Sequence, residues 1–275
     1  MLYQVNASIV LYHNKIEQLK KTIESFLATT LNVKLYLVDN SSNDDLKVLK
    51  NLDERIEYIF NNSNLGYGSA HNIAMRKSID DEVPFHLVLN PDIYFSTGIL
   101  EELFEYMQTH QDVGNTMPQV KYPNGTIQYL AKLLPTPKDL VLRRFIPFKA
   151  WKDNRNRKYE LRESGYNKIM NIPNLSGCFM FLRTSILEKV GLFDENIFMY
   201  LEDTDLNRRI HKNYKTIFYP KVEIVHEYAK ESYVNKKLLL SHIKSAIYYF
   251  NKWGWFFDKE RKNFNEKIME FLKQS

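Results

Sequence analysis

A carboxylate follows a predicted buried strand in the tripeptide Asn90-Pro91-Asp92. The apolar run Phe85–Leu89 predicts that strand, so Asp92 should stand close to its carboxyl end. Carboxylate oxygens bind hard divalent cations, and Mg²⁺ commonly takes only one or two protein ligands beside substrate phosphates. Asp92 could therefore hold a cation that bridges the oxygens of a diphosphate. The same tripeptide also suits a plain turn that ends a strand.

Three carboxylates within four residues open a predicted helix over 201–212: they are Glu202, Asp203 and Asp205. A helix N-terminus stabilises negative charge, so capping explains one or two of them. Three together, directly after an aromatic stretch, are more than capping requires. Asp205 could instead pair with Arg208, which lies three residues further along the helix.

Asp39 and His226 also stand at the ends of predicted strands. Asp39 follows the strand Val33–Val38 and could accept hydrogen bonds from the base or ribose of a nucleotide. Alternatively it caps the segment that starts near Asp44. His226 follows the strand Val222–Val225 and could bind a metal, although a histidine satisfied within the core is the more ordinary interpretation.

The segment Asn61–Gly68 contains two glycines two residues apart before a predicted helix. Such glycines let a ligand approach the backbone closely, although a plain strand-to-helix turn fits as well. The segment follows the third predicted strand and lacks a third glycine, so it matches the dinucleotide fingerprint only superficially. The first strand-to-helix turn, Tyr12–Lys15, has no glycine at all, which argues against a Rossmann dehydrogenase.

Strand and helix patterns alternate through the first third of the chain. The expected strands are Gln4–Tyr12, Val33–Val38, Ile56–Phe60 and Phe85–Leu89, and the expected helices are Ile16–Leu27, Asp44–Leu52 and Ser69–Ile79. Alternation of this kind predicts parallel strands with right-handed crossovers. Because ligands bind at the carboxyl ends of such strands, the polar clusters after the second, third and fourth strands should converge on one crevice.

The second half is less regular. Further strands are expected at Val113–Val120, Met170–Arg183, Thr216–Tyr219 and Val222–Val225, and helices at Thr184–Val190 and Leu201–Lys212. Asn124-Gly125 predicts a hairpin turn. The pattern is helical from Asn235 to the end, with a break near Gly254. We therefore expect an α/β protein with a mixed, mainly parallel sheet flanked by helices and a helical C-terminal extension.

The composition is that of an ordinary soluble globular protein, with 44% hydrophobic and 26% charged residues in 275. The longest apolar runs are too short to cross a bilayer. The N-terminus lacks the pattern of a secretory signal, and a lone Cys178 excludes an internal disulfide. These observations predict a cytoplasmic protein.

The net charge of +5 is unevenly distributed. Residues 138–158 carry eight Lys/Arg and two Asp, and residues 230–275 carry ten Lys/Arg and five Asp/Glu, so the remainder is acidic. An acidic remainder suits a metal site. The basic stretches suit an anionic acceptor or peripheral contact with the inner face of a membrane, unless they are simply solvated helix faces. We expect no nucleic-acid partner.

Taken together and in order, the motifs resemble family-2 glycosyltransferases, which have the GT-A fold, and among them bacterial rhamnosyltransferases of cell-surface polysaccharide synthesis. The matching residues are Val38-Asp39-Asn40-Ser41-Ser42, Asn62-X-Asn64-Leu65-Gly66-Tyr67-Gly68-X-X-X-Asn72, Leu89-Asn90-Pro91-Asp92, Ser176-Gly177-Cys178-Phe179-Met180, Met199-Tyr200-X-Glu202-Asp203-X-Asp205 and His226. Relatives more often have a serine five residues after the histidine, where this chain has Glu231 and then Ser232.

The resemblance implies a role for each matching position. The donor-binding residues it implies are Tyr12, Asp39, Asn64, Gly66, Asn72, Asn90 and Asp92. It implies that Asp92 and His226 bind Mg²⁺ or Mn²⁺, and that Asp203 is the general base beside Glu202. The acceptor-binding residues it implies are Gly177, Cys178, Tyr200 and Glu202. It divides the chain into a GT-A domain over 1–230, with a nucleotide-binding half 1–92 and an acceptor-binding half 93–230, and an extension over 231–275.

The implied reaction is an inverting transfer of a sugar from a nucleotide diphosphate donor to an acceptor hydroxyl. The metal neutralises the departing diphosphate, and one carboxylate on the opposite face of the sugar deprotonates the acceptor. dTDP-rhamnose is the first expected donor, with UDP-linked sugars open, and the acceptor is a glycan or a polyprenyl-pyrophosphate-linked sugar. A sugar nucleotidyltransferase and a non-catalytic carbohydrate-binding protein on the same fold are the alternatives.

Overall fold

The computed structural model of the chain describes residues 3–142, 149–227 and 236–274. Strands and helices alternate in its first part, as predicted. These elements are β1 (Val5–Leu11), α1 (Ile16–Leu27), β2 (Val33–Asp39), η1 (Asp45–Leu52), β3 (Ile56–Phe60), α2 (Tyr67–Asp80) and β4 (Phe85–Leu89). η1 is a 3₁₀ helix, and its buried Leu46 and Leu49 lie three residues apart, which is the period of that helix.

The second part contains shorter elements. They are β5 (Ile93–Tyr94), α3 (Ile99–Thr109), β6 (Val113–Lys121), β7 (Ala131–Lys132), η2 (Lys138–Leu142), α5 (Lys149–Tyr159), η3 (Arg162–Ser164), β8 (Met170–Asn171), β9 (Asn174–Leu175), β10 (Phe179–Arg183), α6 (Thr184–Val190), α7 (Glu202–His211), β11 (Lys215–His226), α8 (Lys236–Trp253) and α9 (Lys259–Gln274).

Two strand predictions in this part were wrong in detail. The expected strand Met170–Arg183 is broken into β8, β9 and β10, which leaves residues 176–178 in a turn. The two strands expected around residue 220 are one strand, β11, with an irregular register between Tyr219 and Glu223. Pro220 lies in this irregularity, because a proline has no N–H for the ladder.

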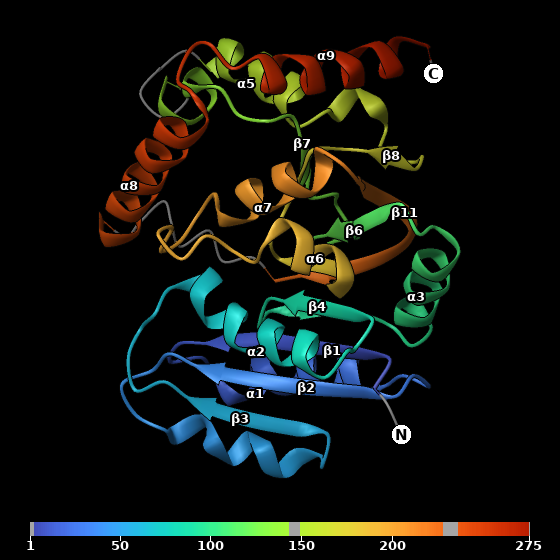
Figure 1. The fold of residues 1–275 in the computed structure, drawn as a ribbon, viewed down its shortest axis with the longest axis vertical. Helices are drawn as coiled ribbons and strands as arrows, with labels where there is room; N and C mark the ends of the chain where they lie inside the picture. The colour runs from blue at the N-terminus through green and yellow to red at the C-terminus, as the bar shows by residue number, and fades with distance from the viewer. Residues whose placement is uncertain (1–2, 143–148, 228–235, 275) are drawn as a thin grey trace.

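The central sheet is mixed and mainly parallel, as predicted, with the order β3-β2-β1-β4-β10-β6-β11-β5 (Figure 1). β1 to β4 run parallel, and β10 is inserted antiparallel between β4 and β6. The residues expected to form a nucleotide-binding half (1–92) and an acceptor-binding half (93–230) therefore share one continuous sheet. β1 to β4 point towards the same edge of the molecule.

Alternate side chains of the central strands enter two cores on opposite faces of the sheet. In β10, Phe179 and Phe181 join the core that includes α1 and α3, whereas Met180 and Leu182 join the core that includes α2, α6 and α7. The period of two residues explains this division. The continuous apolar runs of β4 and β10 thus reflect burial on both faces.

The C-terminal extension predicted from the helical pattern is formed by α8 and α9, which run along the side and the end of the molecule (Figure 1). The predicted break near Gly254 is a turn in which that glycine has φ +100°. No helix in the described residues is long and apolar enough to span a membrane.

Arg208 of α7 joins this extension to the rest of the protein through a buried ion pair. Its guanidinium donates two hydrogen bonds of 2.7 Å to the carboxylate of Asp258 and one of 2.8 Å to Glu260. The same group lies 4.2 Å from the ring centre of Trp253. The pairing with Asp205 considered from the sequence is therefore wrong, because Arg208 turns towards the extension.

Candidate active site

The ends of β1 and β2 bring Tyr12 and Asp39 to one edge of the sheet, because Leu11 lies opposite Asp39 in register. Tyr12 is 55% exposed, but Asp39 is fully buried. One carboxylate oxygen of Asp39 accepts the backbone N–H of Ser41 at 2.8 Å, and the other accepts the hydroxyl of Tyr58 at 2.6 Å. The predicted contacts of Tyr12 and Asp39 with a nucleotide stay predictions.

Gly66 and Gly68 are required by packing within the protein. Gly66 has φ +88°, and a Cβ atom there would lie 2.3 Å from the carbonyl oxygen of Phe198. A Cβ atom on Gly68 would lie 2.8 Å from Cβ of Phe193. The space that we assigned to a ligand beside these glycines is thus taken by the loop before α7. Asn64 is exposed and its Oδ1 accepts the Gly66 N–H at 3.0 Å, so a donor contact of this turn stays a prediction.

Asn72 is held by contacts within the protein, and its predicted donor contact stays a prediction. It is 1% exposed on α2, and its amide is used entirely by the protein. Its Nδ2 donates to the carbonyl oxygen of Phe193 at 2.9 Å and to Glu195 at 3.0 Å, while its Oδ1 accepts the N–H of Phe193 at 3.0 Å. The asparagine therefore holds the segment after α6 against α2.

Asp92 and His226 meet because β5 pairs antiparallel with the end of β11, which sets Ile93 opposite His226. Asp92 Oδ1 and His226 Nε2 lie 3.2 Å apart. Burial alone would lower the pKa of His226, but hydrogen bonds to Asp92 and to Cys178 outweigh it and raise that pKa to about 10. Ser232, the displaced serine of the motif, lies outside the described residues.

Gln128 orients the ring of His226. Its Nε2 donates to the backbone carbonyl of His226 at 2.8 Å, which turns its Oε1 towards the ring Nδ1 at 3.0 Å. Nδ1 then carries a proton and Nε2 faces Asp92, which is the usual arrangement behind a metal-ligating imidazole. This contact could not be predicted from the sequence, because Gln128 is 98 residues from His226 and follows the hairpin turn at Asn124-Gly125.

The Asp92–His226 pair fits a divalent cation. Neighbouring ligands in an octahedral Mg²⁺ site lie about 3 Å apart, given metal–ligand distances of about 2.0–2.1 Å, and the two side-chain atoms are 3.2 Å apart. A carboxylate oxygen with an imidazole nitrogen also suits Mn²⁺. Within the described ranges, no group of three or more His, Cys, Asp or Glu gathers at one point. Mg²⁺ commonly completes its shell with phosphate oxygens and water.

Asp203 is held at the start of α7 with both oxygens fixed by the backbone. Oδ2 accepts the N–H of Gly177 at 2.7 Å, and Oδ1 accepts the N–H of Thr204 at 2.7 Å. The two residues before the helix, Tyr200 and Leu201, both have φ +70°, a left-handed conformation that costs free energy outside glycine. Backbone strain of this kind is concentrated at functional sites.

Glu202 differs from its neighbour because it is buried. Its side chain is 6% exposed, and Oε2 has no hydrogen-bond partner within the described residues. Burial, and then the charge of Asp203, raise the pKa of Glu202 well above its ordinary value. The two adjacent carboxyl groups thus stand in different environments, because Glu202 is buried without a partner for Oε2 in the described part of the chain and Asp203 accepts two backbone N–H groups.

Tyr67 connects the two sides of the site. Its hydroxyl lies 2.9 Å from Oδ1 of Asn90 and 2.7 Å from the carbonyl oxygen of Gly177. Gly177 is the residue whose N–H holds Asp203, and Asn90 directly precedes the Pro91-Asp92 turn. Our sequence prediction gave this tyrosine no role, although it stands between the two glycines of a predicted motif.

A cleft of about 720 Å³ brings most of the predicted side chains together. The predicted residues that line it are Asn90, Gly177, Cys178, Tyr200, Glu202, Asp203 and His226. The predicted residues outside its lining are Tyr12, Asp39, Asn64, Gly66, Asn72 and Asp92. Residues that we did not predict come from the hairpin and from the segment around α5: Tyr122, Gln128, Tyr129, Lys132, Glu160 and Arg162. The hairpin and the segment around α5 therefore form a wall of the site.

A model of glycosyl transferase family 2 matches residues 8–191 of the chain. The chain belongs to this family. The match ends before α7, so the positions of Asp203 and His226 rest on the geometry of this transferase itself.

Two curated relatives are similar over about three quarters of this transferase. N-acetylglucosaminyl-diphospho-decaprenol L-rhamnosyltransferase of Mycobacterium tuberculosis is 28% identical over 221 residues, which cover 74% of this chain and 69% of the relative. Rhamnosyltransferase WbbL of Escherichia coli K12 is 25% identical over 210 residues, which cover 74% of this chain and 75% of the relative.

Solved structures confirm the GT-A fold. GalNAc-T7, crystallised with UDP, GalNAc and Mn²⁺, superposes with a TM-score of 0.61 at 16% identity over 82% of this chain, which spans only 43% of that protein. S. aureus TarS 1–349 in complex with UDP gives a TM-score of 0.57 at 13% identity over 88% of this chain and 65% of that one. At these identities the likeness concerns the fold.

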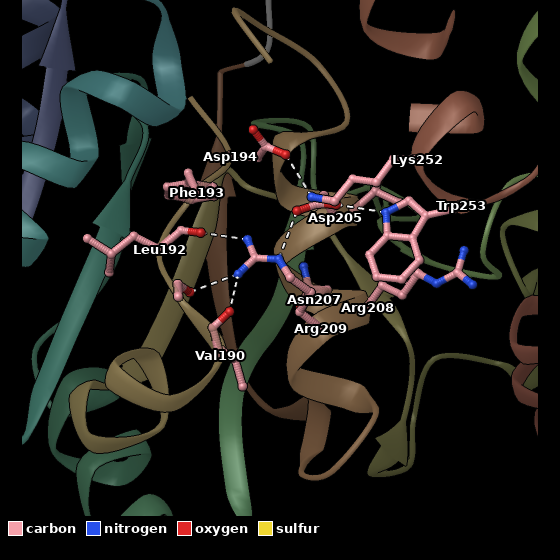
Figure 2. Close-up of polar contacts among 12 residues, drawn as sticks. Val190, Leu192, Phe193, Asp194, Asp205, Asn207, Arg208, Arg209, Lys252 and Trp253 are labelled. Carbon is pink, nitrogen blue, oxygen red and sulfur yellow. Dashed lines mark hydrogen bonds and ion pairs between the residues drawn. The ribbon is translucent and has the colours of Figure 1, made fainter. Parts of the chain in front are cut away.

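Asp205, the third carboxylate of the acidic cluster, has a structural position in this transferase (Figure 2). It is fully buried, and its oxygens accept hydrogen bonds of 2.9 Å from Arg209 and 2.8 Å from the Trp253 indole. Lys252 lies 2.8 Å away and also pairs with Asp194. Asp205 thus joins α7 to α8, which explains why the cluster holds more carboxylates than capping requires.

Proposed function

We propose that this chain is an inverting, metal-dependent glycosyltransferase in which Asp203 is the general base. The observation that carries the proposal is the fixed carboxylate of Asp203, which two backbone N–H groups hold at the wall of the cleft. Among the described residues, Oδ2 accepts only the N–H of Gly177 and keeps a second lone pair for the proton of an acceptor hydroxyl, whereas Oδ1 also lies 3.3 Å from the hydroxyl of Thr204. Glu202 beside it is buried, which raises its pKa and makes it the weaker candidate for an ionised base, so we assign it to orienting the acceptor.

Asp92 and His226 are the residues that would hold Mg²⁺ or Mn²⁺, with Gln128 behind the histidine. A bound divalent cation would neutralise the charge that develops on the departing diphosphate. Around it, Asn90 is held by Tyr67 and so stands beside the metal residues in a fixed orientation. Inversion requires a base on the side of the sugar opposite to the leaving group. Asp203 and Asp92 lie on separate elements, so each can serve one of these two sides.

L-Rhamnose from a dTDP donor is our first candidate for the transferred sugar, with UDP-linked sugars next. The names of the two curated relatives support rhamnose, and the name of the mycobacterial one supports a lipid-diphosphate-linked acceptor. The UDP in the two solved neighbours supports a nucleotide diphosphate donor. Residues of this chain's own donor pocket would include Asp39, Asn64 and Gly66.

The test compares three variants for donor binding and for release of nucleoside diphosphate. Asp203→Asn keeps the shape of the carboxylate but cannot take a proton, so transfer should fall by about 10²–10⁴-fold with unchanged donor affinity. Asp92→Ala should instead lose metal-dependent donor binding. Glu202→Gln should be mild, because an amide keeps the shape and the hydrogen-bonding capacity of a side chain that only orients the acceptor.

The opposite pattern would overturn the assignment. If Asp203→Asn transfers sugar at the wild-type rate while Glu202→Gln is inactive, the two carboxyl groups have exchanged roles. Formation of pyrophosphate from a nucleoside triphosphate would establish a nucleotidyltransferase instead. Donor binding that is indifferent to a chelator and to Asp92→Ala would contradict the metal site.

A further inference from the structure

α8 carries exposed apolar residues next to the apolar residues that it buries. Its inner face forms a buried cluster with Leu201 at the start of α7. Its outer face carries Leu240, Ile243 and Ile247, which are 58%, 39% and 45% exposed and recur at i, i+3 and i+7. A helix on the surface of a globular protein ordinarily has a polar outer face. The inner stripe is explained by the fold, and the outer stripe is not.

Two exposed aromatic residues follow the end of α8. Phe256 and Phe257 follow the turn at Gly254 and are 78% and 98% exposed. Large apolar side chains gathered at one exposed place mark an interaction site in soluble proteins. We call the set of Leu240, Ile243, Ile247, Phe256 and Phe257 the α8 surface.

The charge around the α8 surface is basic. α8 contains four lysines and no aspartate or glutamate. The two carboxylates in the next turn, Asp258 and Glu260, are held by Arg208. One of the four lysines, Lys252, is paired with Asp194 and Asp205. A helix that combines exposed apolar residues with lysines and no acidic residue, and that is followed by aromatic residues, is typical of segments that lie in the interface of an anionic membrane.

α8 itself contacts the candidate active site through another side of the helix. Ser245 on the inner side of α8 donates a hydrogen bond of 2.8 Å to the carbonyl oxygen of Met199, and the rings of His242 and Tyr200 are 5.2 Å apart. Met199 and Tyr200 line the cleft. In Figure 1, α8 runs along the edge towards which β2 and β3 point, which is the edge where the predicted donor residues lie.

From these observations we infer that the α8 surface docks this transferase on an anionic lipid bilayer, with α8 lying parallel to the membrane and the cleft next to the headgroups. The apolar residues enter the boundary between headgroups and acyl chains, and the lysines attract the anionic headgroups. The inference goes beyond the proposed reaction, and it does not depend on which sugar is transferred. It is argued from α8 and the turn after it, since 143–148 of the other basic stretch lie outside the described residues.

The test is sedimentation of the full chain with vesicles, without donor, metal or acceptor. Wild type should bind vesicles of phosphatidylglycerol and phosphatidylcholine more tightly than vesicles of phosphatidylcholine alone, and binding should weaken in high salt. Replacing Phe256 and Phe257 together by serine should lower the partition coefficient by about tenfold or more, because two exposed rings no longer leave water. The pair Ile243→Ser and Ile247→Ser should act in the same direction.

Val48→Ser and Leu52→Ser together form the matched control. These side chains are 53% and 44% exposed on η1, which packs beside the edge strand β3, so this variant should bind vesicles as wild type does. Unchanged thermal unfolding and nucleotide binding would show that each variant is folded. Equal binding of wild type and the Phe256/Phe257 variant, or no binding of wild type to anionic vesicles, would overturn the inference. So would a wild-type dimer that this variant converts to a monomer, since a second copy would then cover the surface.

Because vesicle binding is measured without substrates, its outcome is independent of the transfer assay. A chain that binds anionic vesicles through the α8 surface but transfers no sugar would refute the proposed function alone. A chain that transfers sugar but ignores vesicles would refute the docking alone.

Discussion

Replacement of Arg208 by methionine should detach the C-terminal helices from α7 at a large cost in stability. The side chains of Arg208 and Asp258 are 2% and 3% exposed, and two hydrogen bonds of 2.7 Å join them. Without the guanidinium, the carboxylate of Asp258 is left buried beside Glu260 with no cation of equal reach. Methionine keeps much of the aliphatic length, so the change tests the charge rather than the packing.

The expected cost follows from the burial of the pair. Removing one partner of a buried, hydrogen-bonded ion pair costs about 3–5 kcal/mol, whereas replacing both by apolar residues is often close to neutral. Arg208→Met should therefore lose about 3–5 kcal/mol of unfolding free energy. The double variant Arg208→Met/Asp258→Leu should lose clearly less than the sum of the two single variants, because the two side chains are directly coupled.

Urea denaturation followed by tryptophan fluorescence measures these differences. Lys215→Met is the control, because its ion pair with Asp112 is 51% and 56% exposed and should contribute at most about 1 kcal/mol. The reasoning is refuted if Arg208→Met costs no more than this control. Strict additivity of Arg208→Met and Asp258→Leu would also refute it, since the pair would then make no joint contribution.

Two further predictions concern buried histidines. Burial lowers the pKa of His86 to about 3 from an ordinary 6.5, so below pH 6.5 the unfolded chain binds a proton at this residue and the folded chain does not. The contribution of His86 to the unfolding free energy should therefore fall by up to about 1.4 kcal/mol per pH unit between pH 6.5 and 5. A thermal unfolding temperature that is constant over this range would contradict the prediction. Gln128→Leu removes the partner of His226 Nδ1 and should weaken Mn²⁺ binding in the presence of nucleotide by about 10–100-fold. Calorimetry measures this affinity, and an unchanged value would exclude Gln128 from the metal site.

Local patterns predicted the elements of this fold well because their causes are local. The continuous apolar run of β4 and the helical spacing of Leu19, Ile23 and Phe26 in α1 both follow from burial. The resemblance of the ordered motifs then placed Asn90, Gly177 and Asp203 on one cleft. Only Asn90 follows a parallel strand, since Gly177 precedes the antiparallel β10 and Asp203 lies in the first turn of α7. The break between β9 and β10 was missed, because nothing in an apolar run shows where a strand must turn.

Contacts between distant segments explain what the sequence could not predict. Asn72 stands in a motif that resembles a donor site, but its amide is used by the backbone of Phe193, 121 residues away. The motif alone cannot separate a residue that touches substrate from one that holds a neighbouring loop. Gln128 illustrates the reverse case, because it matches no motif and reaches the site only through the tertiary fold.

The contact between Gly66 and Phe198 has a consequence for engineering. The carbonyl oxygen of Phe198 accepts the N–H of Tyr67 at 2.9 Å, and Gly66 leaves no space for a methyl group. The predicted nucleotide turn and the loop that leads to Asp203 therefore cannot be replaced independently of each other. Grafting a turn from another transferase to change the donor would displace Phe198 and, four residues later, Glu202. Donor and acceptor preference in this chain have to be redesigned together.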